Sequence, residues 1–408
     1  AQALSFIAIM RVPWWEIWCT QGVSPDKMVG GKFATLDYYR KVLQGANRLK
    51  EEHNVEMKAN HTWGEMAKLK RAAKIAKKAD KAFRTNFKTL DQEQAKVFMD
   101  ILGLAASTLD DLNEPHQSFE YYNQMIEYDK CAIVRQTNAT LEYEYCSGGL
   151  WSRVIIQLRF QMNQPEKAKE YYDRAVQLKW AGDQVHHWPN EWHIPTLMMP
   201  KLRSQPLWTK DLTTSGKMEA ASPFLQEEVK QLIEVGWMQK TTQNDHVLIT
   251  KGSWSELKLW SGKEWSEACL TAPRTCRFLS ELPELMGTFP TEQTHNVHLP
   301  KEAGYFRLEP GTHLKPHTGP ANWHLYCHLG LIVPSGPQLM VGGTEYSWQE
   351  GKAICFDDSY IHEAWHNGTE DRYVLLVTLW HPDLGEPEVV DMAKHKQTLE
   401  GMLGKAEL

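Results

Sequence analysis

Two histidines and one arginine in the C-terminal half have the types and spacing needed to bind a metal ion and a carboxylate. His317 precedes a predicted strand that begins near His324, and His362 follows 45 residues after His317. Arg372 stands ten residues beyond His362, at the start of the last predicted strand. Neutral imidazoles suit Fe(II) when coordination positions stay open for other ligands. A planar guanidinium pairs with a carboxylate through two parallel hydrogen bonds. The three residues therefore predict an iron site beside a group that binds a carboxylate.

The carboxylate that usually completes such an iron site is missing. In the common facial triad an Asp or Glu stands two residues after the first histidine, and here that position is Gly319. Taken alone, this argues against a metal site. Asp357 and Asp358 could supply a carboxylate. Their place at a strand end before His362 is more typical of turn capping, or of hydrogen bonding to a metal ligand, and we favour that interpretation.

Short apolar runs predict that the C-terminal half is a β-sandwich or jelly-roll barrel. The runs are rich in Val, Ile, Leu and aromatic residues, and hairpin-type turns such as Gly342-Gly343 separate them. They cover residues 326–333, 338–341, 344–348, 353–356 and 373–380. Short strands without intervening helices are typical of all-β sandwiches and barrels. One amphipathic helix is predicted before them, at residues 224–238.

The first half has the apolar spacing of helices. Helical runs are predicted at residues 36–49, 64–82, 94–111 and 151–162. Residues 118–128 and 168–178 resemble each other, each with a Tyr-Tyr pair, and each follows a turn of the form Asn-x-Pro. Helix, turn and helix in this arrangement is typical of tetratricopeptide hairpins, although the copies stand 50 residues apart and the usual period is 34. An ordinary helical bundle is an equally good interpretation of these residues.

The composition indicates a soluble globular protein with enough apolar residues for a core. The 408 residues are 42% hydrophobic and 24% charged, with a formal net charge of -6. Neither the charge balance nor any local basic run predicts a nucleic-acid partner. The length allows two domains of ordinary size.

Seven cysteines occur without a CxxC pair, so a zinc ribbon or a thioredoxin-type site is not predicted. Cys269 and Cys276 flank a proline-containing loop that a disulfide could close, although two free thiols remain the alternative. The apolar run at residues 1–19 is interrupted by Arg11, Pro13 and Glu16, so it predicts neither a spanning helix nor a signal peptide. Sequons at Asn60, Asn138 and Asn367 are weak signs of a secretory route.

Several long motifs resemble the aspartyl/asparaginyl beta-hydroxylase family. They are EPGTHLKPHTGPAN at 309–322, HLGLIVP at 328–334, WQEGK at 348–352, FDDS at 356–359, HEAW at 362–365 and LWHPDL at 379–384. The resemblance covers about residues 205–384. This family is known for a two-histidine iron site with a glycine in place of the carboxylate, so Gly319 becomes support for a metal site.

The resemblance implies roles for individual residues. His317 and His362 would bind iron, Arg372 would bind one carboxylate of 2-oxoglutarate, and His328 would contact the same cosubstrate. His324, at a position where the family commonly has Arg, is a further cosubstrate candidate. We interpret His313 and His381 as structural or as hydrogen-bond partners of ligands. The family also has a cysteine pair spaced like Cys269 and Cys276, which favours the disulfide.

Several positions depart from the family pattern. Phe306 stands where Ser is common, and His324 and Tyr326 stand where Arg is common. A further arginine, expected shortly before Gly252, is replaced by Ile249 or a neighbour. Fewer arginines would weaken the binding of a substrate carboxylate. These departures therefore argue against Asp or Asn as the substrate residue, whereas they do not affect the predicted iron site.

The predicted fold class is multidomain, α followed by all-β. Residues 1–200 form a helical repeat, tetratricopeptide-like domain, 201–385 a double-stranded β-helix (jelly-roll) oxygenase domain and 386–408 a helical tail. The larger family members carry a helical repeat region, which favours the tetratricopeptide interpretation. The resemblance implies an Fe(II)- and 2-oxoglutarate-dependent dioxygenase that uses O2 to hydroxylate Asp or Asn in a protein or peptide.

The resemblance also bears on partners and compartment. EGF-like domains are candidate substrates, the endoplasmic reticulum lumen or membrane is the expected location, and a membrane anchor could precede residue 1. Two alternatives remain. One is a lipid hydroxylase of the same superfamily, which Phe306 and Tyr326 slightly favour. The other is a repeat scaffold whose oxygenase domain is non-catalytic.

Overall fold

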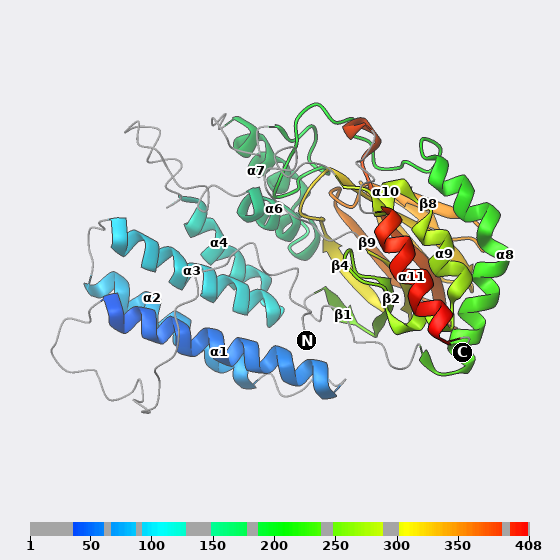
Figure 1. The fold of residues 1–408 in the computed structure, drawn as a ribbon. Helices are drawn as coiled ribbons and strands as arrows, with labels where there is room; N and C mark the ends of the chain where they lie inside the picture. Colours follow the sequence, from blue (N-terminus) through cyan, green and yellow to red (C-terminus); the bar gives the residue numbers. More distant parts are fainter. Residues whose placement is uncertain are drawn as a thin grey trace.

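The computed structural model has a helical region followed by two antiparallel sheets with helices on one side (Figure 1). It describes residues 36–60, 67–86, 92–127, 148–177, 187–237, 248–288, 302–385 and 392–406. The N-terminal run and the Asn138 sequon lie outside this part of the chain. Among the described helices, none combines the length and the apolar composition needed to cross a bilayer.

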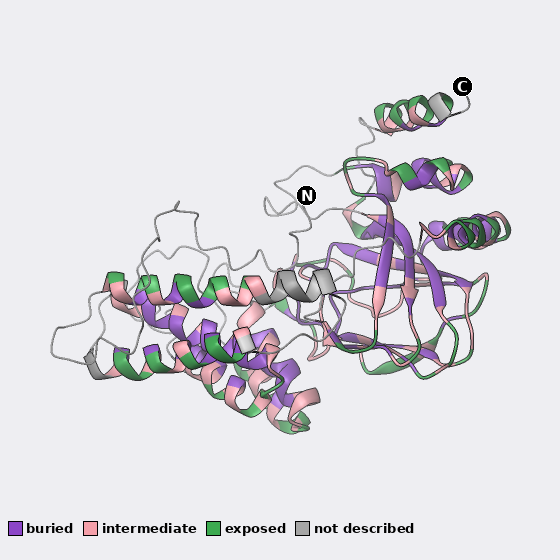
Figure 2. Ribbon diagram, turned by 90° about the horizontal axis from the view of Figure 1, so that it is seen from below, coloured by how far each residue is buried: buried purple, intermediate pink, exposed green. Residues whose placement is uncertain are grey.

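The helical region is built from amphipathic helices that bury one face. Its elements are α1 (Leu36–Asn60), α2 (Ala67–Asn86), α3 (Gln92–Asp111), α4 (Pro115–Glu127), α6 (Gly148–Ile156), η4 (Gln157–Gln161) and α7 (Pro165–Gln177). A shared cluster of buried side chains, including Tyr39, Phe83 and Trp151, holds them together, and Figure 2 shows the buried faces turned inward. The predicted N-terminal helical region is therefore confirmed.

The two similar segments both form helix–turn–helix units. Asn113 follows α3 and Asn163 follows η4, and both adopt the left-handed backbone conformation, with φ of 57° and 53°. Asparagine tolerates this conformation better than most residues, so the turns depend on the asparagine that the two segments share. The two units also contact each other, because the Tyr171 hydroxyl donates a hydrogen bond to Asn123 Oδ1.

The C-terminal half contains two five-stranded antiparallel sheets. The strands are β1 (Ile249–Lys251), β2 (Trp254–Trp260), β3 (Ala303–Leu308), β4 (His313–His317), β5 (His324–Ile332), β6 (Pro337–Val341), β7 (Thr344–Ser347), β8 (Ala353–Phe356), β9 (His362–His366) and β10 (Arg372–Trp380). One sheet has the order β1-β4-β9-β6-β7 and the other β2-β3-β10-β5-β8. Leu314, Val341, Phe356 and Val374 belong to one buried cluster drawn from both sheets, so the sheets share a core.

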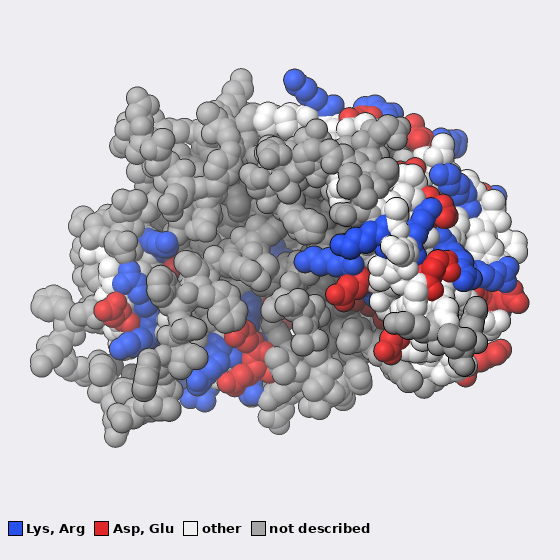
Figure 3. Space-filling model, in the orientation of Figure 1, with Lys and Arg blue, Asp and Glu red and all other residues white. Residues whose placement is uncertain are grey.

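Helices cover the outer face of the sheet that contains β10. They are α8 (Thr213–Glu234), α9 (Pro273–Ser280), α10 (Pro283–Met286) and α11 (Met392–Ala406), with the short turn η7 (Glu267–Leu270) beside them. A buried cluster that includes Trp260, Leu325 and Leu375 lies between these helices and the sheet. Figure 3 shows acidic and basic side chains intermixed on this side, where Arg277 pairs with Glu400 on α11. α11 lies within residues 386–408, where a helical tail is predicted from the sequence.

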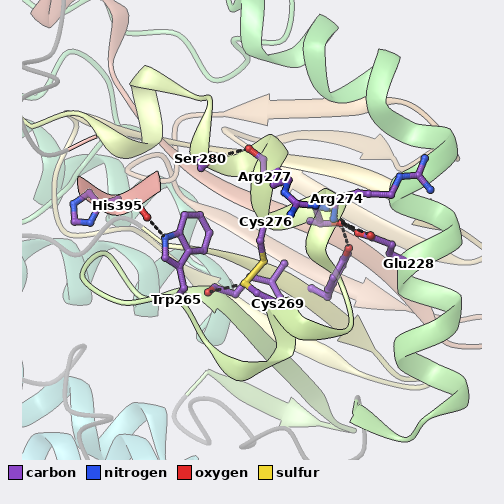
Figure 4. The surroundings of a disulfide bond; sticks show 11 residues. Glu228, Trp265, Cys269, Arg274, Cys276, Arg277, Ser280 and His395 are labelled. Atoms are coloured by element: carbon purple, nitrogen blue, oxygen red, sulfur yellow. Dashed lines mark hydrogen bonds between the residues drawn. A yellow bond between two sulfur atoms is a disulfide. The ribbon is translucent and has the colours of Figure 1, made fainter. Parts of the chain in front are cut away.

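A buried glutamate joins α8 to α9. Glu228 on α8 accepts hydrogen bonds from the backbone nitrogens of Arg274 and Thr275, at 2.9 and 2.8 Å, in the first turn of α9 (Figure 4). A carboxylate in this position satisfies amides that the helix itself leaves unbonded. Next to it, Cys269 and Cys276 form the predicted disulfide, with 5.7 Å between their Cα atoms.

Some element boundaries differ from the sequence prediction. The helix predicted at residues 224–238 begins at Thr213, because the chain accommodates Pro223 inside α8. The strands β1, β2, β3, β4 and β9 were not among the predicted runs. β1 and β9 are short, and β4 carries a proline and two histidines, so their alternation is weak. A second disulfide, Cys327–Cys355, joins β5 to β8 and was also missed.

Candidate metal and carboxylate site

The two predicted metal ligands meet across neighbouring strands. His317 ends β4, His362 begins β9, and the two residues are direct partners in the antiparallel register. Their ring centroids lie 4.2 Å apart, with the ring planes inclined at 53°. Antiparallel pairing thus brings together two side chains that are 45 residues apart in the sequence.

Both rings are held in one tautomer by the backbone. Nδ1 of His317 donates to the carbonyl of Lys315 at 2.7 Å, and Nδ1 of His362 donates to the carbonyl of Tyr360 at 2.9 Å. A carbonyl only accepts, so the proton sits on Nδ1 and the lone pair of a neutral ring is on Nε2. Burial lowers the pKa of His362 to about 4 and, with help from His362, lowers that of His317 well below its usual range. Both imidazoles are therefore neutral near pH 7, the form that binds a metal.

Gly319 is required by a carboxylate that lies against it. A Cβ atom at this position would come within 2.0 Å of Asp358 Oδ2. The backbone nitrogen of Gly319 also donates to the carbonyl of Asp358 at 2.6 Å. Asp358 is buried, its Oδ1 has no hydrogen-bond partner, and burial raises the pKa of the carboxyl well above its usual range. Asp358 therefore occupies the space in which the side chain of a third ligand at position 319 would begin.

Asp357 has the capping role that its position suggested. Its Oδ1 accepts hydrogen bonds from both the backbone nitrogen and the hydroxyl of Ser359. Burial raises the pKa of this carboxyl to about 7. His313 pairs with Glu363, and His381 accepts a hydrogen bond from the backbone nitrogen of Asp383 in the turn after β10. Neither histidine is brought to the pair formed by His317 and His362.

Arg372 is a buried cation with unused hydrogen-bond donors. Only 3% of the residue is exposed, and its Nε and Nη1 atoms have no partner. Its guanidinium carbon lies 4.4 Å from the ring centroid of Trp348. The neighbouring Asp371 pairs with Arg307. Burial lowers the pKa of Arg372, because removal from water disfavours the charged form.

His328 also has unpaired polar atoms. Neither ring nitrogen of His328 has a hydrogen-bond partner. Its ring stacks on that of Trp348, with the centroids 6.0 Å apart and the planes 14° from parallel. Burial, and next the charge of Arg372, lower the pKa of His328 well below its usual range. The neutral imidazole can therefore both donate and accept a hydrogen bond.

Aromatic rings connect the two groups of residues. The ring of Phe356 lies 5.2 Å from that of His328 and 5.4 Å from that of His362, centroid to centroid. Pairwise contacts thus connect Arg372 to His362 through Trp348, His328 and Phe356. Arg372 and His362 both lie close enough to His328 to add to the lowering of its pKa by burial. Trp348 and Phe356 were not predicted as site residues. Their places inside WQEGK and FDDS were the only signals.

His324 does not lie with Arg372. It pairs with Trp380 in the register of β5 and β10, and its ring lies 4.5 Å from that of the tryptophan, with the planes inclined at 56°. Trp380 is eight residues along β10 from Arg372, which is roughly 26 Å in a strand. Two other residues depart from the family pattern: Phe306 stacks on Trp254, and Tyr326 contacts the ring of Phe356. Tyr326 is therefore connected to His362 through the ring of Phe356.

The donor set fits a divalent metal with several open positions. Among the described residues no cluster contains three or more His, Cys, Asp or Glu side chains arranged around a metal. His317 and His362 supply two neutral imidazoles, each with a free lone pair on Nε2. Beside Gly319, the buried Asp358 has a carboxylate oxygen without a hydrogen-bond partner. Such a site would depend on exogenous ligands to complete the coordination.

The fold and the site define a class of protein: an antiparallel two-sheet domain with paired histidines and a buried, unpaired arginine. Comparison with known proteins identifies the family that it resembles. Residues 219–382 match the model of the aspartyl/asparaginyl beta-hydroxylase family. The resemblance indicated by the sequence motifs is confirmed over these residues.

Named relatives support the same assignment. The chain is 33% identical to the human aspartyl/asparaginyl beta-hydroxylase over 216 residues, which are 50% of this chain and 27% of that protein. It is 37% identical to the mouse aspartate beta-hydroxylase domain-containing protein 2 over 132 residues, 32% of this chain and 38% of that protein. The chain thus spans about a quarter to two fifths of these relatives' lengths.

Similarity to solved structures is partial. A prolyl-4-hydroxylase from Pseudomonas putida superposes with a TM-score of 0.25 at 14% identity, covering 41% of this chain and 86% of that one. A superposition this limited defines neither the fold nor the function of the chain.

Proposed function

We propose that the chain is an Fe(II)- and 2-oxoglutarate-dependent dioxygenase that hydroxylates a side chain of a protein substrate. The observation that carries the proposal is the buried Arg372, whose Nε and Nη1 lack partners, across a row of rings from the paired His317 and His362. An uncompensated buried cation is costly, so a protein that retains one is expected to bind an anion there.

The arrangement suits a dicarboxylate that spans both ends. Arg372 would bind the distal carboxylate of 2-oxoglutarate in a two-pronged contact, with His328 donating a hydrogen bond beside it. The keto-acid end would then face His317 and His362. Trp348 and Phe356 would line the aliphatic middle of the cosubstrate, where an apolar wall excludes water.

The residues of the chain would act mainly by holding and orienting. His317 and His362, each fixed through Nδ1, would present Nε2 to iron without reorganisation. When bound, iron would couple the conversion of 2-oxoglutarate and O2 into succinate and CO2 to hydroxylation of the substrate. Asp358 would lie beside the open position left by Gly319 and could accept a hydrogen bond from a ligand there.

Asp or Asn in a peptide is the substrate residue we propose, because the named relatives are aspartyl/asparaginyl beta-hydroxylases. Tyr326 and His324 stand where the family resemblance expects arginines, so recognition of a substrate carboxylate would rest on other groups. We further propose that the two-sheet domain is a double-stranded β-helix and that the helical region is tetratricopeptide-like. The helical region would present a protein substrate, such as a disulfide-rich EGF-like domain, to the two-sheet domain in the endoplasmic reticulum.

A coupled assay tests the function. The full chain is incubated with Fe(II), 2-oxoglutarate and O2, with and without a panel of Asp- and Asn-containing peptides, and succinate is measured beside peptide mass. The proposal predicts succinate formation that needs all three components and a gain of one oxygen on a peptide. Absence of succinate under every condition, from protein that is folded, would support the non-catalytic scaffold instead.

A further inference from the structure

A buried polar network joins the segment before the β-domain to the metal-binding loop, which we define as residues 357–362. His193 is at its centre and is fully buried. Its ring stacks on that of Tyr360 at 4.3 Å and 14°, and the two residues form an isolated antiparallel bridge. His193 lies more than 120 residues before either predicted metal ligand, so no motif pointed to it.

The hydrogen bonds of this network have a consistent direction. The Ser359 hydroxyl donates to Asp357 Oδ1 at 2.5 Å, so it is free to accept from His193 Nε2 at 2.7 Å. Nδ1 of His193 then accepts from the Ser204 hydroxyl at 2.6 Å. Ser204 in turn can accept from the Tyr360 hydroxyl at 2.7 Å. A neutral His193 with its proton on Nε2 therefore satisfies every one of these groups at once.

The network ends at a predicted metal ligand. The carbonyl of Tyr360 accepts the hydrogen bond that orients His362, and the Tyr360 ring is stacked on His193. The same loop is held by two backbone contacts from the preceding segment: Ile361 donates to the carbonyl of Trp192, and Asp357 donates to that of Pro206. The side chain of His193 thus contacts the loop at Ser359 and Tyr360, between the two positions, Asp357 and Ile361, at which the backbone of the preceding segment is hydrogen-bonded to it.

We propose that His193 is a positioning residue for the metal site. It holds Ser359 and Tyr360 so that the Tyr360 carbonyl keeps the His362 ring aimed at the metal. This inference rests on the proposed function, because it takes His362 to be a ligand. Partners of this kind commonly change metal affinity by about 10- to 100-fold when they are removed.

Three variants separate positioning from general stability. His193→Phe keeps a ring to stack on Tyr360 but removes both hydrogen bonds. His193→Gln keeps a donor and an acceptor and should recover part of the effect. Trp188→Phe is the matched control, because Trp188 is equally buried in the same segment and donates to the carbonyl of Pro195, away from the loop. If His193→Phe fails to fold, Ser359→Ala replaces it, since that change removes the same link from its other side.

The test is a calorimetric titration of the full chain with Fe(II) under anaerobic conditions. Thermal unfolding of each variant is measured in parallel. We expect His193→Phe to weaken Fe(II) binding about tenfold or more, His193→Gln to weaken it less, and Trp188→Phe to change it less than twofold. Equal affinity in wild type and folded His193→Phe would overturn the positioning role and leave the proposed function standing. No Fe(II) binding by the wild type would overturn the metal site and this proposal together.

Discussion

The two ends of the candidate site differ in how their ligand-binding side chains are held. At the metal end, His317 and His362 are each fixed by a backbone carbonyl, and the loop before His362 is tied down by His193. At the other end, Arg372 and His328 keep buried nitrogens without partners. Contacts within the chain therefore orient the metal-binding histidines before a metal binds. These nitrogens of Arg372 and His328, in contrast, gain hydrogen-bond partners only when a ligand binds.

The largest effect is expected at the metal end. Replacing His362 by Ala removes one of only two imidazole donors, so we predict loss of Fe(II) binding by about a thousandfold or more. His313→Ala is the control, because His313 is on the same strand as His317 but pairs with Glu363. Calorimetric titration under anaerobic conditions measures both. Retention of wild-type affinity in His362→Ala would remove the metal assignment.

Substitution of Arg372 should have opposite effects on ligand binding and on the stability of the ligand-free protein. We expect Arg372→Met to weaken 2-oxoglutarate binding about a hundredfold, because a desolvated guanidinium–carboxylate pair is lost. The ligand-free variant should unfold at the same or a higher temperature, since an unpaired buried charge has been replaced by an apolar side chain of similar length.

Arg307→Met provides the comparison for this change. Arg307 is on the neighbouring strand β3 and is paired with Glu309 and Asp371. Its loss should leave cosubstrate affinity unchanged and should lower or maintain stability. A strong loss of stability in Arg372→Met would mean that Arg372 has protein partners and is not waiting for an anion.

His328→Phe should give a smaller effect of the same kind. The ring can still stack on Trp348, but the two nitrogens disappear. Because neither nitrogen has a protein partner, we expect unchanged or slightly higher thermal stability together with 2-oxoglutarate binding weakened about tenfold. Thermal unfolding and cosubstrate titration of the same sample test both parts. Unchanged cosubstrate affinity would place His328 outside the binding site.

Trp348→Phe is the mildest change. It keeps an aromatic face near Arg372 but reduces the cation–π attraction, which is worth about 2 kcal/mol for a desolvated pair. We expect only a few-fold weaker cosubstrate binding. Trp254→Phe, at the stacked ring of Phe306, should leave that affinity unaltered. An effect as large as that of Arg372→Met would show that Trp348 does more than support the guanidinium.

The sequence predicted the regular parts of the fold well and the irregular parts poorly. β8 was placed with its observed bounds, and β5, β6, β7 and β10 were placed within two residues, because their apolar runs are continuous or alternate clearly. β4 and β9 hold the two predicted ligands, and their polar histidines hide the strand pattern. In these two strands, histidines and a proline stand where the residues that mark a strand were expected, whereas β5 and β10, which carry His328 and Arg372, keep clear apolar runs.

For the site, motifs identified which residues to consider, but packing decided how they are arranged. His317, His362, Arg372 and His328 were identified from sequence, and the structure places them along one row of rings. His193 could not be identified, because its link to Ser359 exists only after a segment more than 160 residues earlier packs on the loop. Nor could the space that Asp358 takes beside Gly319 be read from their types alone.

The central claim is that the two ends bind one ligand together, and thermodynamic linkage tests it most directly. The affinity for 2-oxoglutarate is measured anaerobically by calorimetry with and without Fe(II), in wild type and in Arg372→Met. If one dicarboxylate contacts both ends, metal should tighten its binding at least about tenfold, and the cosubstrate should tighten metal binding by the same factor. In Arg372→Met, metal-dependent binding should persist at much lower affinity. Equal 2-oxoglutarate affinity with and without Fe(II) in the wild type would contradict the claim.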